Sequence, residues 1–377
     1  MAAGGAWSAG DPVGRRHFAD VGTLTLEARG ALPDVTVAYE TWGTLNAARD
    51  NAVLVLHALT GDSHVSGPAT SGHPTAGWWD ALVGPGRALD TDQWFVVAPN
   101  VLGGCQGTTG PASPAPDGRA WGSRFPFLTV RDQVAAEARL ADRLGIDSWA
   151  SVIGGSMGGM RVLEWAVTYP DRLRSAVVLA STAYATAEQI AWCEPQLLAI
   201  RADAQWAGGD YHELDGPGPV AGLGIARRIA HVTYRSELEL AERFGRSAQG
   251  DEQPIGGSGR YAVESYLDHH ADKLHRRFDA GSYVVLTEAM NSHDVGRGRS
   301  GVQQALGRVT CDLYVASVDS DRLYPPRLSE EIVAAVPTAR PLLTVSSPYG
   351  HDGFLIETSQ VGEVVRRSLA SARVSAP

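Results

Sequence analysis

The stretch "SVIGGSMGGM", residues 151–160, places four glycines around a single serine, Ser156. A β-branched apolar run precedes it (148–153) and a helical pattern follows it (159–170), so the sequence predicts a strand, a sharp turn and a helix. In the pattern G-x-S-x-G, small neighbours keep the chain from colliding with a serine held in a strained turn. The pattern indicates a serine nucleophile at a helix N-terminus. A glycine-rich turn without chemistry is the alternative, and a P-loop is excluded because the ending G-K-[S/T] is missing.

The rest of the chain fits a strand–helix alternation around this turn. Continuous apolar runs predict further buried strands at 51–59, 93–100, 175–182, 311–318 and 341–347. Such runs, rather than alternating ones, are typical of a parallel sheet covered on both faces. Residues 129–145 predict an amphipathic helix that Thr129 caps and Gly145 ends. We therefore expect a doubly wound α/β sheet of the α/β-hydrolase type.

The alternation breaks between residues 183 and 305. Three helical patterns replace it, at 187–202, 223–244 and 261–278, and Gly/Pro-rich pieces separate them. We interpret residues 183–305 as a helical lid inserted into a core formed by residues 17–182 and 306–377. The small, Gly/Ala-rich residues 1–16 are expected to be disordered.

A serine nucleophile in this fold requires an acidic residue and then a histidine, each after a late strand. The strand at 311–318 precedes Asp319 and Asp321, and the strand at 341–347 precedes His351. We favour Asp321 as the partner of His351, because Asp319 follows its strand so closely that it could simply cap the strand end. His351 would take the proton of Ser156, and the aspartate would hold its tautomer.

The developing oxyanion needs two backbone N–H donors. One is expected from Met157, the residue after the nucleophile, and the other from Leu59 or Thr60, which follow the first core strand. His57 and His64 lie in the same loop, but without a cluster of carboxylates they do not predict a metal site.

Composition excludes several classes of protein. A formal charge of −10 without a basic stripe argues against nucleic-acid binding. No apolar run reaches the roughly 18 residues that a membrane span needs, and the N-terminus lacks a signal-peptide pattern. The three cysteines (Cys105, Cys193, Cys311) are scattered, which fits a reduced, cytoplasmic protein.

Several stretches, in order, resemble the homoserine O-acetyltransferase family. They are "HALTGDSHVSG" (57–67), residues 77–111, "GGSMGGMRVLEWA" (154–166), "ARRIAHVTYRS" (226–236), "SDRLYP" (320–325) and "YGHDGFL" (349–355). The resemblance runs from about residue 17 to 369 and includes the lid. It implies a cytoplasmic homodimer without a metal, in which Ser156 takes an acetyl group from acetyl-CoA and passes it to the hydroxyl of L-homoserine.

The resemblance also assigns the site residues. The catalytic serine, aspartate and histidine fall on Ser156, Asp321 and His351. The arginine that holds the homoserine carboxylate falls on Arg227, and the acidic residue that meets its amine falls on Asp352. A zwitterionic amino acid suits one guanidinium and one carboxylate. From the residues alone, the alternatives are an exposed face of a helix for Arg227 and stabilisation of a loop for Asp352.

The sequence leaves alternatives for the donor, the acceptor and the class of activity. The donor could be succinyl-CoA or the acceptor serine on the same scaffold. A plain esterase would leave the lid and Arg227 without a purpose, and a non-catalytic binding protein of this fold would be expected to lack a member of the triad. The sequence does not say which residues hold the phosphates of CoA.

Overall fold

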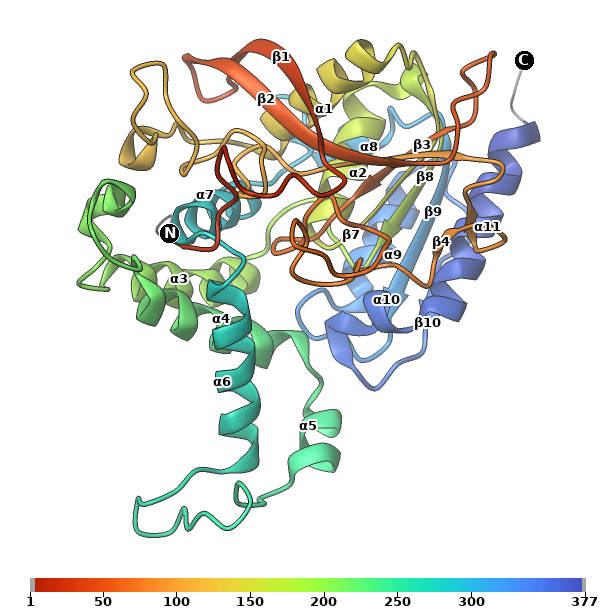
Figure 1. Cartoon of the computed structure of the whole chain (residues 1–377). Coiled ribbons are helices and arrows are strands. Elements are labelled where there is room, and N and C mark those ends of the chain that lie inside the picture. The colour runs from red at the N-terminus through yellow and green to blue at the C-terminus, as the bar shows by residue number, and fades with distance from the viewer. Residues whose placement is uncertain (1–3, 375–377) are drawn as a thin grey trace.

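A computed structural model describes residues 4–374, and its centre is an eight-stranded sheet (Figure 1). The strand order is β1-β2-β6-β3-β7-β8-β9-β10, and every neighbouring pair from β6 to β10 is parallel. The predicted buried strands are observed, so the predicted α/β fold class is confirmed. They are β3 (Ala52–Leu56), β6 (Phe95–Pro99), β7 (Trp149–Gly155), β8 (Leu173–Leu179), β9 (Asp312–Val318) and β10 (Leu343–Val345).

Helices cover both faces of the sheet. One face packs on α1 (Val130–Leu144), α2 (Met157–Thr168), α8 (Val302–Leu306) and α9 (Pro326–Ala335). The other face packs on α11 (Thr358–Val374) and on the segment that holds the short strands β4 (Val83–Gly84) and β5 (Leu89–Asp90). Within residues 4–374, no helix is both long and apolar enough to cross a membrane.

The helix predicted over 129–145 forms with the expected ends. Thr129 and Asp132 make reciprocal side-chain contacts with each other's backbone N–H, and Gly145 ends the helix at φ 67°. These contacts satisfy N–H groups that the first turn leaves unpaired, and the positive φ explains the glycine.

The sheet begins with an antiparallel pair that continuous apolar runs do not mark. β1 (His17–Thr25) pairs with β2 (Ala31–Trp42), which in turn runs antiparallel to β6. Buried residues tend to alternate with more exposed ones along these strands, because only part of the pair faces the core.

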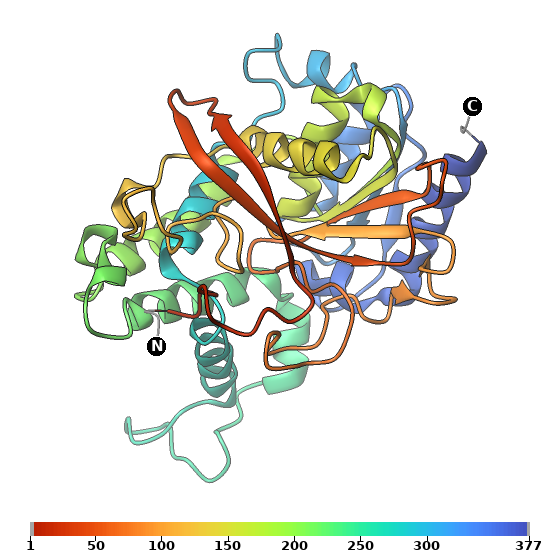
Figure 2. The ribbon, with the colours of Figure 1, turned by 45° about the horizontal axis from the view of Figure 1, so that its top comes forward.

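The lid segment, residues 183–305, carries five α-helices before α8. They are α3 (Ala187–Arg201), α4 (Val220–Tyr234), α5 (Glu237–Phe244), α6 (Ala262–His275) and α7 (Ala280–Asn291). The helix predicted over 223–244 is two helices, because Ser236 caps α5 by accepting the N–H of Glu239. Helices α5 and α6, with the loop between them, form a lobe that projects from the body (Figures 1 and 2).

Residues 4–16 pack against the body, although their composition predicted disorder. The N–H of Trp7 donates to the carbonyl of Cys105 at 2.9 Å, and the rings of Trp7 and Phe18 lie 5.0 Å apart. The N–H of Gly5 donates to the carbonyl of Phe278, which follows α6. One aromatic contact, between the half-buried Trp7 and the exposed Phe18, and these backbone bonds give the segment a defined position despite its small residues. Residues 1–3, also part of that prediction, lie outside the described residues.

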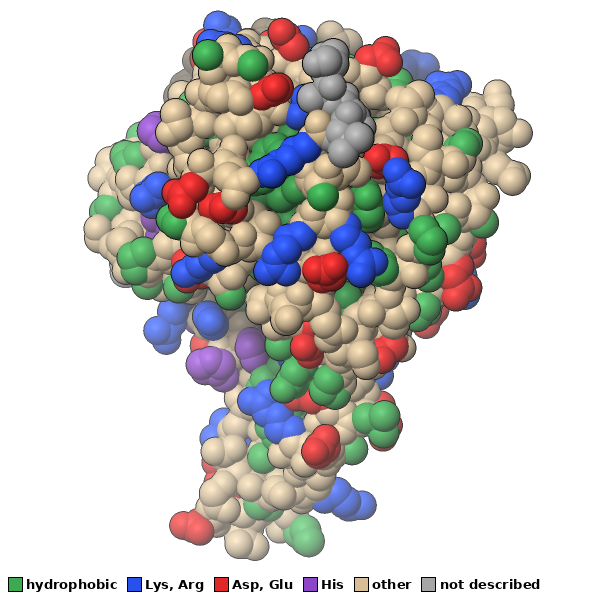
Figure 3. Space-filling view, turned by 90° about the vertical axis from the view of Figure 1, so that its right-hand side faces the viewer, with side chains coloured by type: hydrophobic (Ala, Val, Ile, Leu, Met, Phe, Trp, Pro, Cys, Tyr) green, Lys and Arg blue, Asp and Glu red, His purple; other side chains and the backbone are tan. Residues whose placement is uncertain are grey.

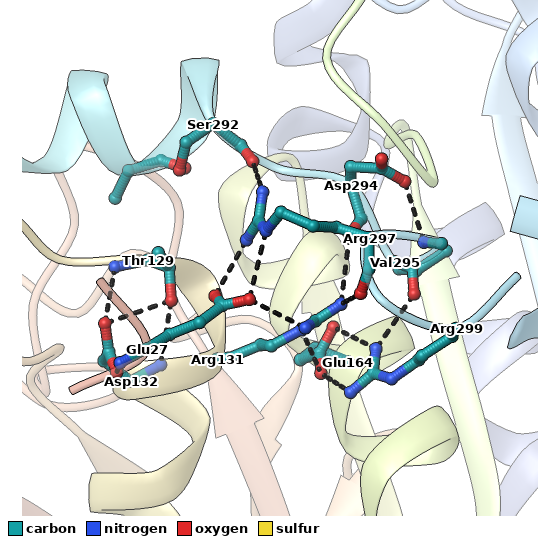
Figure 4. A network of polar contacts seen from close by, with 12 residues as sticks. Glu27, Thr129, Arg131, Asp132, Glu164, Ser292, Asp294, Val295, Arg297 and Arg299 are labelled. Atoms are coloured by element: carbon teal, nitrogen blue, oxygen red, sulfur yellow. Dashed lines mark hydrogen bonds and ion pairs between the residues drawn. The ribbon is translucent and has the colours of Figure 1, made fainter. Parts of the chain in front are cut away.

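A network of arginines and glutamates fixes the end of the lid segment to the core (Figure 4). Glu164 of α2 is buried and forms ion pairs with Arg131 of α1 and with Arg299. Glu27, in the turn between β1 and β2, pairs with Arg131 at 2.7 Å and with Arg297 at 2.8 Å. Segment 292–301 is thereby tied to three parts of the core.

Candidate active site

Ser156 occupies the turn between β7 and α2, as the sequence predicts. Its backbone adopts φ 56° and ψ −125°, a region that non-glycine residues rarely enter. A Cβ on Gly154 would lie 2.6 Å from the backbone of Gly158, and a Cβ on Gly158 would lie 2.1 Å from the carbonyl oxygen of Leu56. The glycines of G-x-S-x-G are therefore required by contact between β3, β7 and α2.

Backbone donors lie where an oxyanion would form. Met157 is the first residue of α2, and Leu59 lies in the loop after β3 and lines the cavities on both sides of Ser156. In the part of the chain that the structure describes, no hydrogen bond occupies either N–H. Both groups are thus available to a negatively charged oxygen, and the helix N-terminus favours such charge.

His351 and Asp321 form a buried pair beside Ser156. The imidazole Nδ1 lies 2.7 Å from Oδ2 of Asp321, and both residues are 3% exposed. The other carboxylate oxygen accepts the N–H groups of Leu323 and Tyr324, which fixes its orientation. Burial by itself lowers the pKa of His351, but the charge and hydrogen bond of Asp321 outweigh it, so the pKa lies above its usual value.

Asp319 has a different set of partners. Its carboxylate accepts the N–H of Ser347 at 3.0 Å and the hydroxyl of Ser346 at 2.8 Å. These contacts join the loops after β9 and β10. The geometry therefore supports Asp321, rather than Asp319, as the partner of His351.

The candidate active site opens into a cavity of about 260 Å³ that Ser156, His351, Arg227 and Asp352 all line. Arg227 reaches it from α4, donates to the hydroxyl of Thr60 at 3.3 Å and lies over the ring of Tyr234. It makes no ion pair with a described residue, and its buried Nε has no partner. A guanidinium without a carboxylate at a cavity wall is suited to an anionic ligand.

The neighbouring arginine of α4 behaves differently. Arg228 points away from the cavity and donates two hydrogen bonds, of 2.9 and 2.7 Å, to Asp268 of α6. It thus fastens α4 and α6 to each other and does not line the cavity.

Asp352 has a partner that sequence reasoning did not find. Its Oδ2 lies 3.2 Å from Nη1 of Arg235, which also holds Glu239 at 2.7 Å. Burial raises the pKa of Asp352, while His351, Arg235 and Arg227 act to lower it. The S-x-x-E pattern from Ser236 to Glu239 would have placed Arg235 at a helix boundary, but nothing in the sequence links it to a residue 117 positions away.

A second, smaller cavity lies on the other side of Ser156. Its volume is about 30 Å³. Like Ser156, Leu59 and Tyr234 line both the larger and the smaller cavity. None of the described residues that line it is charged, and among them are Met160, Trp192, Cys193, Met290 and Tyr324. His351 and Asp352 line only the larger cavity. The two sides of the serine therefore differ in size and in charge.

Strand β2 and the loop after β3 together form a buried cluster of potential metal ligands. Glu40, His64 and His73 offer ligand atoms that lie within 4.8 Å of one another. However, Nδ1 of His64 faces Glu40 at 3.0 Å, and Nε2 of His73 accepts the N–H of Arg15 at 3.0 Å. Because protein partners already use these nitrogens, we interpret the cluster as structural. His57 also has two protein partners, Ala58 and the N–H of Val101, and burial lowers its pKa to about 3.

Comparison with known proteins places these features in context. A family model described as alpha/beta hydrolase fold matches residues 51–358. The homoserine O-acetyltransferase of Thermobifida fusca (strain YX) is 62% identical over 371 residues, which cover 98% of each chain. The enzyme of the same name from Mycobacterium tuberculosis (strain ATCC 25177 / H37Ra) is 57% identical and covers 94% of this chain and 93% of its own.

Solved structures with the same fold include proteins named for more than one activity. A homoserine O-acetyltransferase from Bacillus anthracis superposes with a TM-score of 0.86 at 27% identity, covering 94% of this chain and 97% of its own. Esterase E22 superposes with a TM-score of 0.85 at 25% identity, covering 94% and 99%. The fold alone therefore does not separate acetyl transfer from ester hydrolysis. The sequence identities strongly favour acetyl transfer.

Proposed function

This chain belongs to the homoserine O-acetyltransferase family, and we propose that it moves an acetyl group from acetyl-CoA to the hydroxyl of L-homoserine by way of an ester on Ser156. The products are CoA and O-acetyl-L-homoserine, an intermediate of methionine biosynthesis. The observation that carries the assignment of residues is the shared cavity, in which the nucleophile and its base meet an arginine and an aspartate of opposite charge.

In the first half-reaction, His351 takes the proton of the Ser156 hydroxyl while the serine oxygen attacks the thioester carbonyl. The N–H groups of Met157 and Leu59 hold the oxyanion. The carbon–sulfur bond then breaks, and the CoA sulfur receives the proton from His351. Asp321 keeps the imidazole in the required tautomer and stabilises its charged form.

In the second half-reaction, homoserine occupies the space that CoA has left. Its carboxylate lies against Arg227 and its ammonium against Asp352, which directs the hydroxyl to the acetyl ester. His351 accepts the hydroxyl proton as the new ester bond forms and returns it to Ser156 as the old ester bond breaks. Because proton transfer requires His351, both CoA and homoserine must use the larger cavity, which His351 lines.

The smaller cavity then receives the acyl group. A cavity needs roughly 10–15 Å³ to hold one water molecule. The volume of about 30 Å³ therefore has room for about two. This space suits the methyl of an acetyl group. A succinyl group would bring a carboxylate to a wall on which the described residues carry no positive charge. The cavity therefore supports acetyl-CoA over succinyl-CoA as donor.

The family resemblance further implies a homodimer in the cytoplasm, and both are part of the proposal. A plain esterase is the competing function. Water, at about 55 M, competes with homoserine for the acetyl ester, whereas enzymes generally have KM values for their substrates in the micromolar to millimolar range. A transferase must therefore position the acceptor and limit water, and Arg227 and Asp352 supply the positioning.

Mass spectrometry of the protein after brief exposure to acetyl-CoA without homoserine tests the function. We expect one added acetyl group on the peptide that bears Ser156, its release as O-acetyl-L-homoserine when homoserine is added, and neither event with Ser156→Ala. Full turnover with an unmodified Ser156 would contradict the acyl-enzyme. Rapid loss of the acetyl group to water, unaffected by homoserine, would identify an esterase.

A further inference from the structure

The wall of the larger cavity carries more positive charge than one amino-acid substrate needs. Besides Arg227, it includes Lys273 of α6 and Arg277, four residues further along the chain. Lys273 is exposed and forms no ion pair or hydrogen bond with a described residue. Arg277 donates to the carbonyl of Thr60 at 2.7 Å, and its buried Nε has no partner.

Neither cation forms an ion pair with a described residue, in a chain whose formal charge is −10, and the charge of Asp62 acts on Arg277 only from beyond ion-pair distance. Among the described residues, the buried Arg161 is paired with the carboxylate of Glu137, whereas the buried Arg16 bonds only to carbonyl and amide oxygens. An unpaired guanidinium costs free energy when it is removed from water, unless a ligand supplies the missing negative charge. If Arg227 holds the homoserine carboxylate, Lys273 and Arg277 are left for another anion.

A neighbouring cavity shows where that anion would extend. It measures about 230 Å³ and shares Thr60, Lys273 and Arg277 with the larger cavity, so the two lie on either side of these residues. Its other lining residues include Asp62, Thr75 and Trp78. The indole N–H of Trp78 donates to the carbonyl of Asp62 at 3.0 Å, which fixes the ring at this cavity.

The surface around this junction agrees with an anionic ligand. Figure 3 shows His and Lys/Arg side chains gathered at the neck where the lobe of α5 and α6 joins the body. The C-terminal half of α6 contributes exposed His269 and Lys273 to this region. The carboxylate of Asp62 is the one acidic group among the described lining residues of the neighbouring cavity. It suits the amino or hydroxyl groups of a nucleoside rather than a phosphate.

We propose that Lys273 and Arg277 hold the phosphates of the CoA donor at the junction of the two cavities, and that its adenosine lies in the neighbouring cavity beside Trp78. The pantetheine arm then runs through the larger cavity to Ser156, where its thioester reacts. This assignment rests on the proposed function, because it takes acetyl-CoA as the donor. It explains how an acidic protein binds an acidic substrate.

Binding of adenosine 3′,5′-bisphosphate, which carries the nucleotide end of CoA without its thiol arm, tests the site apart from catalysis. Isothermal titration calorimetry on the full chain should show binding that weakens with added salt. Lys273→Ala should weaken it about tenfold, as expected for loss of one charge-assisted contact, and Lys273→Glu should weaken it further. Arg276→Ala is the matched control, because Arg276 is an exposed neighbour that lines neither cavity, and it should bind as the wild type does.

A second measurement compares two acetyl donors. Lys273→Ala should lower kcat/KM for acetyl-CoA about tenfold more than for S-acetyl-N-acetylcysteamine, which has no phosphate. An unchanged ratio, or bisphosphate binding that Lys273→Glu does not weaken, would overturn the phosphate site while leaving acetyl transfer intact. If neither donor acetylates Ser156, the proposed function fails, and the calorimetry still decides whether an anionic nucleotide binds here.

Discussion

The core side and the lid side of the active-site cavity differ in how their charges are neutralised. On the core side, His351 and Asp321 are buried, paired at 2.7 Å and held by further hydrogen bonds. On the lid side, Arg227, Lys273 and Arg277 face the cavity and form no ion pair with any residue between 4 and 374. The core half is therefore complete before a substrate arrives, whereas under the proposed function the lid half acquires its counter-charges from the substrates. Catalysis and recognition are thus separable by mutation.

The largest effect is expected on the core side. Asp321→Asn should lower the rates of both half-reactions by orders of magnitude, because the amide stabilises the wrong tautomer of His351; the corresponding change in a serine protease lowers kcat by about 10⁴-fold. Rapid-quench measurement of the CoA burst and steady-state turnover would show both losses. Asp319→Asn is the control, because its carboxylate only joins two loops, and a reversed pair of results would reassign the triad.

A smaller and more selective effect is expected on the lid side. Arg227→Ala should leave the burst of CoA from the first half-reaction nearly intact. It should lower kcat/KM for homoserine by roughly ten- to a hundred-fold, which is the loss of about 1.5–3 kcal/mol for a charge-assisted contact. Arg228→Ala, whose side chain pairs with Asp268, is the control. If Arg227→Ala abolished the burst as well, the division between core and lid would not hold.

The smallest effect is expected on the pH dependence of the first half-reaction, through the charge of Asp352. His351 must be neutral to act as a base, so the burst rate should fall as the pH decreases through its pKa, which Asp321 and Asp352 raise above the usual value of 6.5. Asp352→Asn removes one of these charges and lowers the pKa of His351. The imidazole then stays neutral at lower pH, and the acidic limb of the burst rate should move to lower pH.

Stopped-flow detection of free CoA, without homoserine, gives this profile independently of the acceptor. Asp319→Asn should leave the limb in place. A limb that stays fixed in Asp352→Asn, or moves to higher pH, would mean that the carboxylate of Asp352 does not act on His351.

What the sequence could predict was set by local patterns, in the core and in the lid alike. The buried strands, and the order of Ser156, Asp321 and His351 after them, follow from patterns that are local in sequence. The pair β1 and β2 was not predicted, because its burial tends to alternate and lacks a continuous apolar run. The contact between Arg235 and Asp352 was not predicted either, because it depends on how α4 and α5 pack over the loop after β10. Lid residues act through tertiary contacts, which local patterns do not contain.

The arrangement of one reactive cavity on the His351 side of Ser156 also bears on metabolic control. Under the proposed mechanism, CoA and homoserine enter this space in turn, so CoA released by the first half-reaction can return and attack the acetyl ester before homoserine arrives. That attack regenerates acetyl-CoA and frees Ser156. The fraction of enzyme carrying an acetyl group then follows the ratio of acetyl-CoA to CoA, rather than the concentration of acetyl-CoA alone. An enzyme built this way reports the acetylation state of the cellular CoA pool in its rate of product formation.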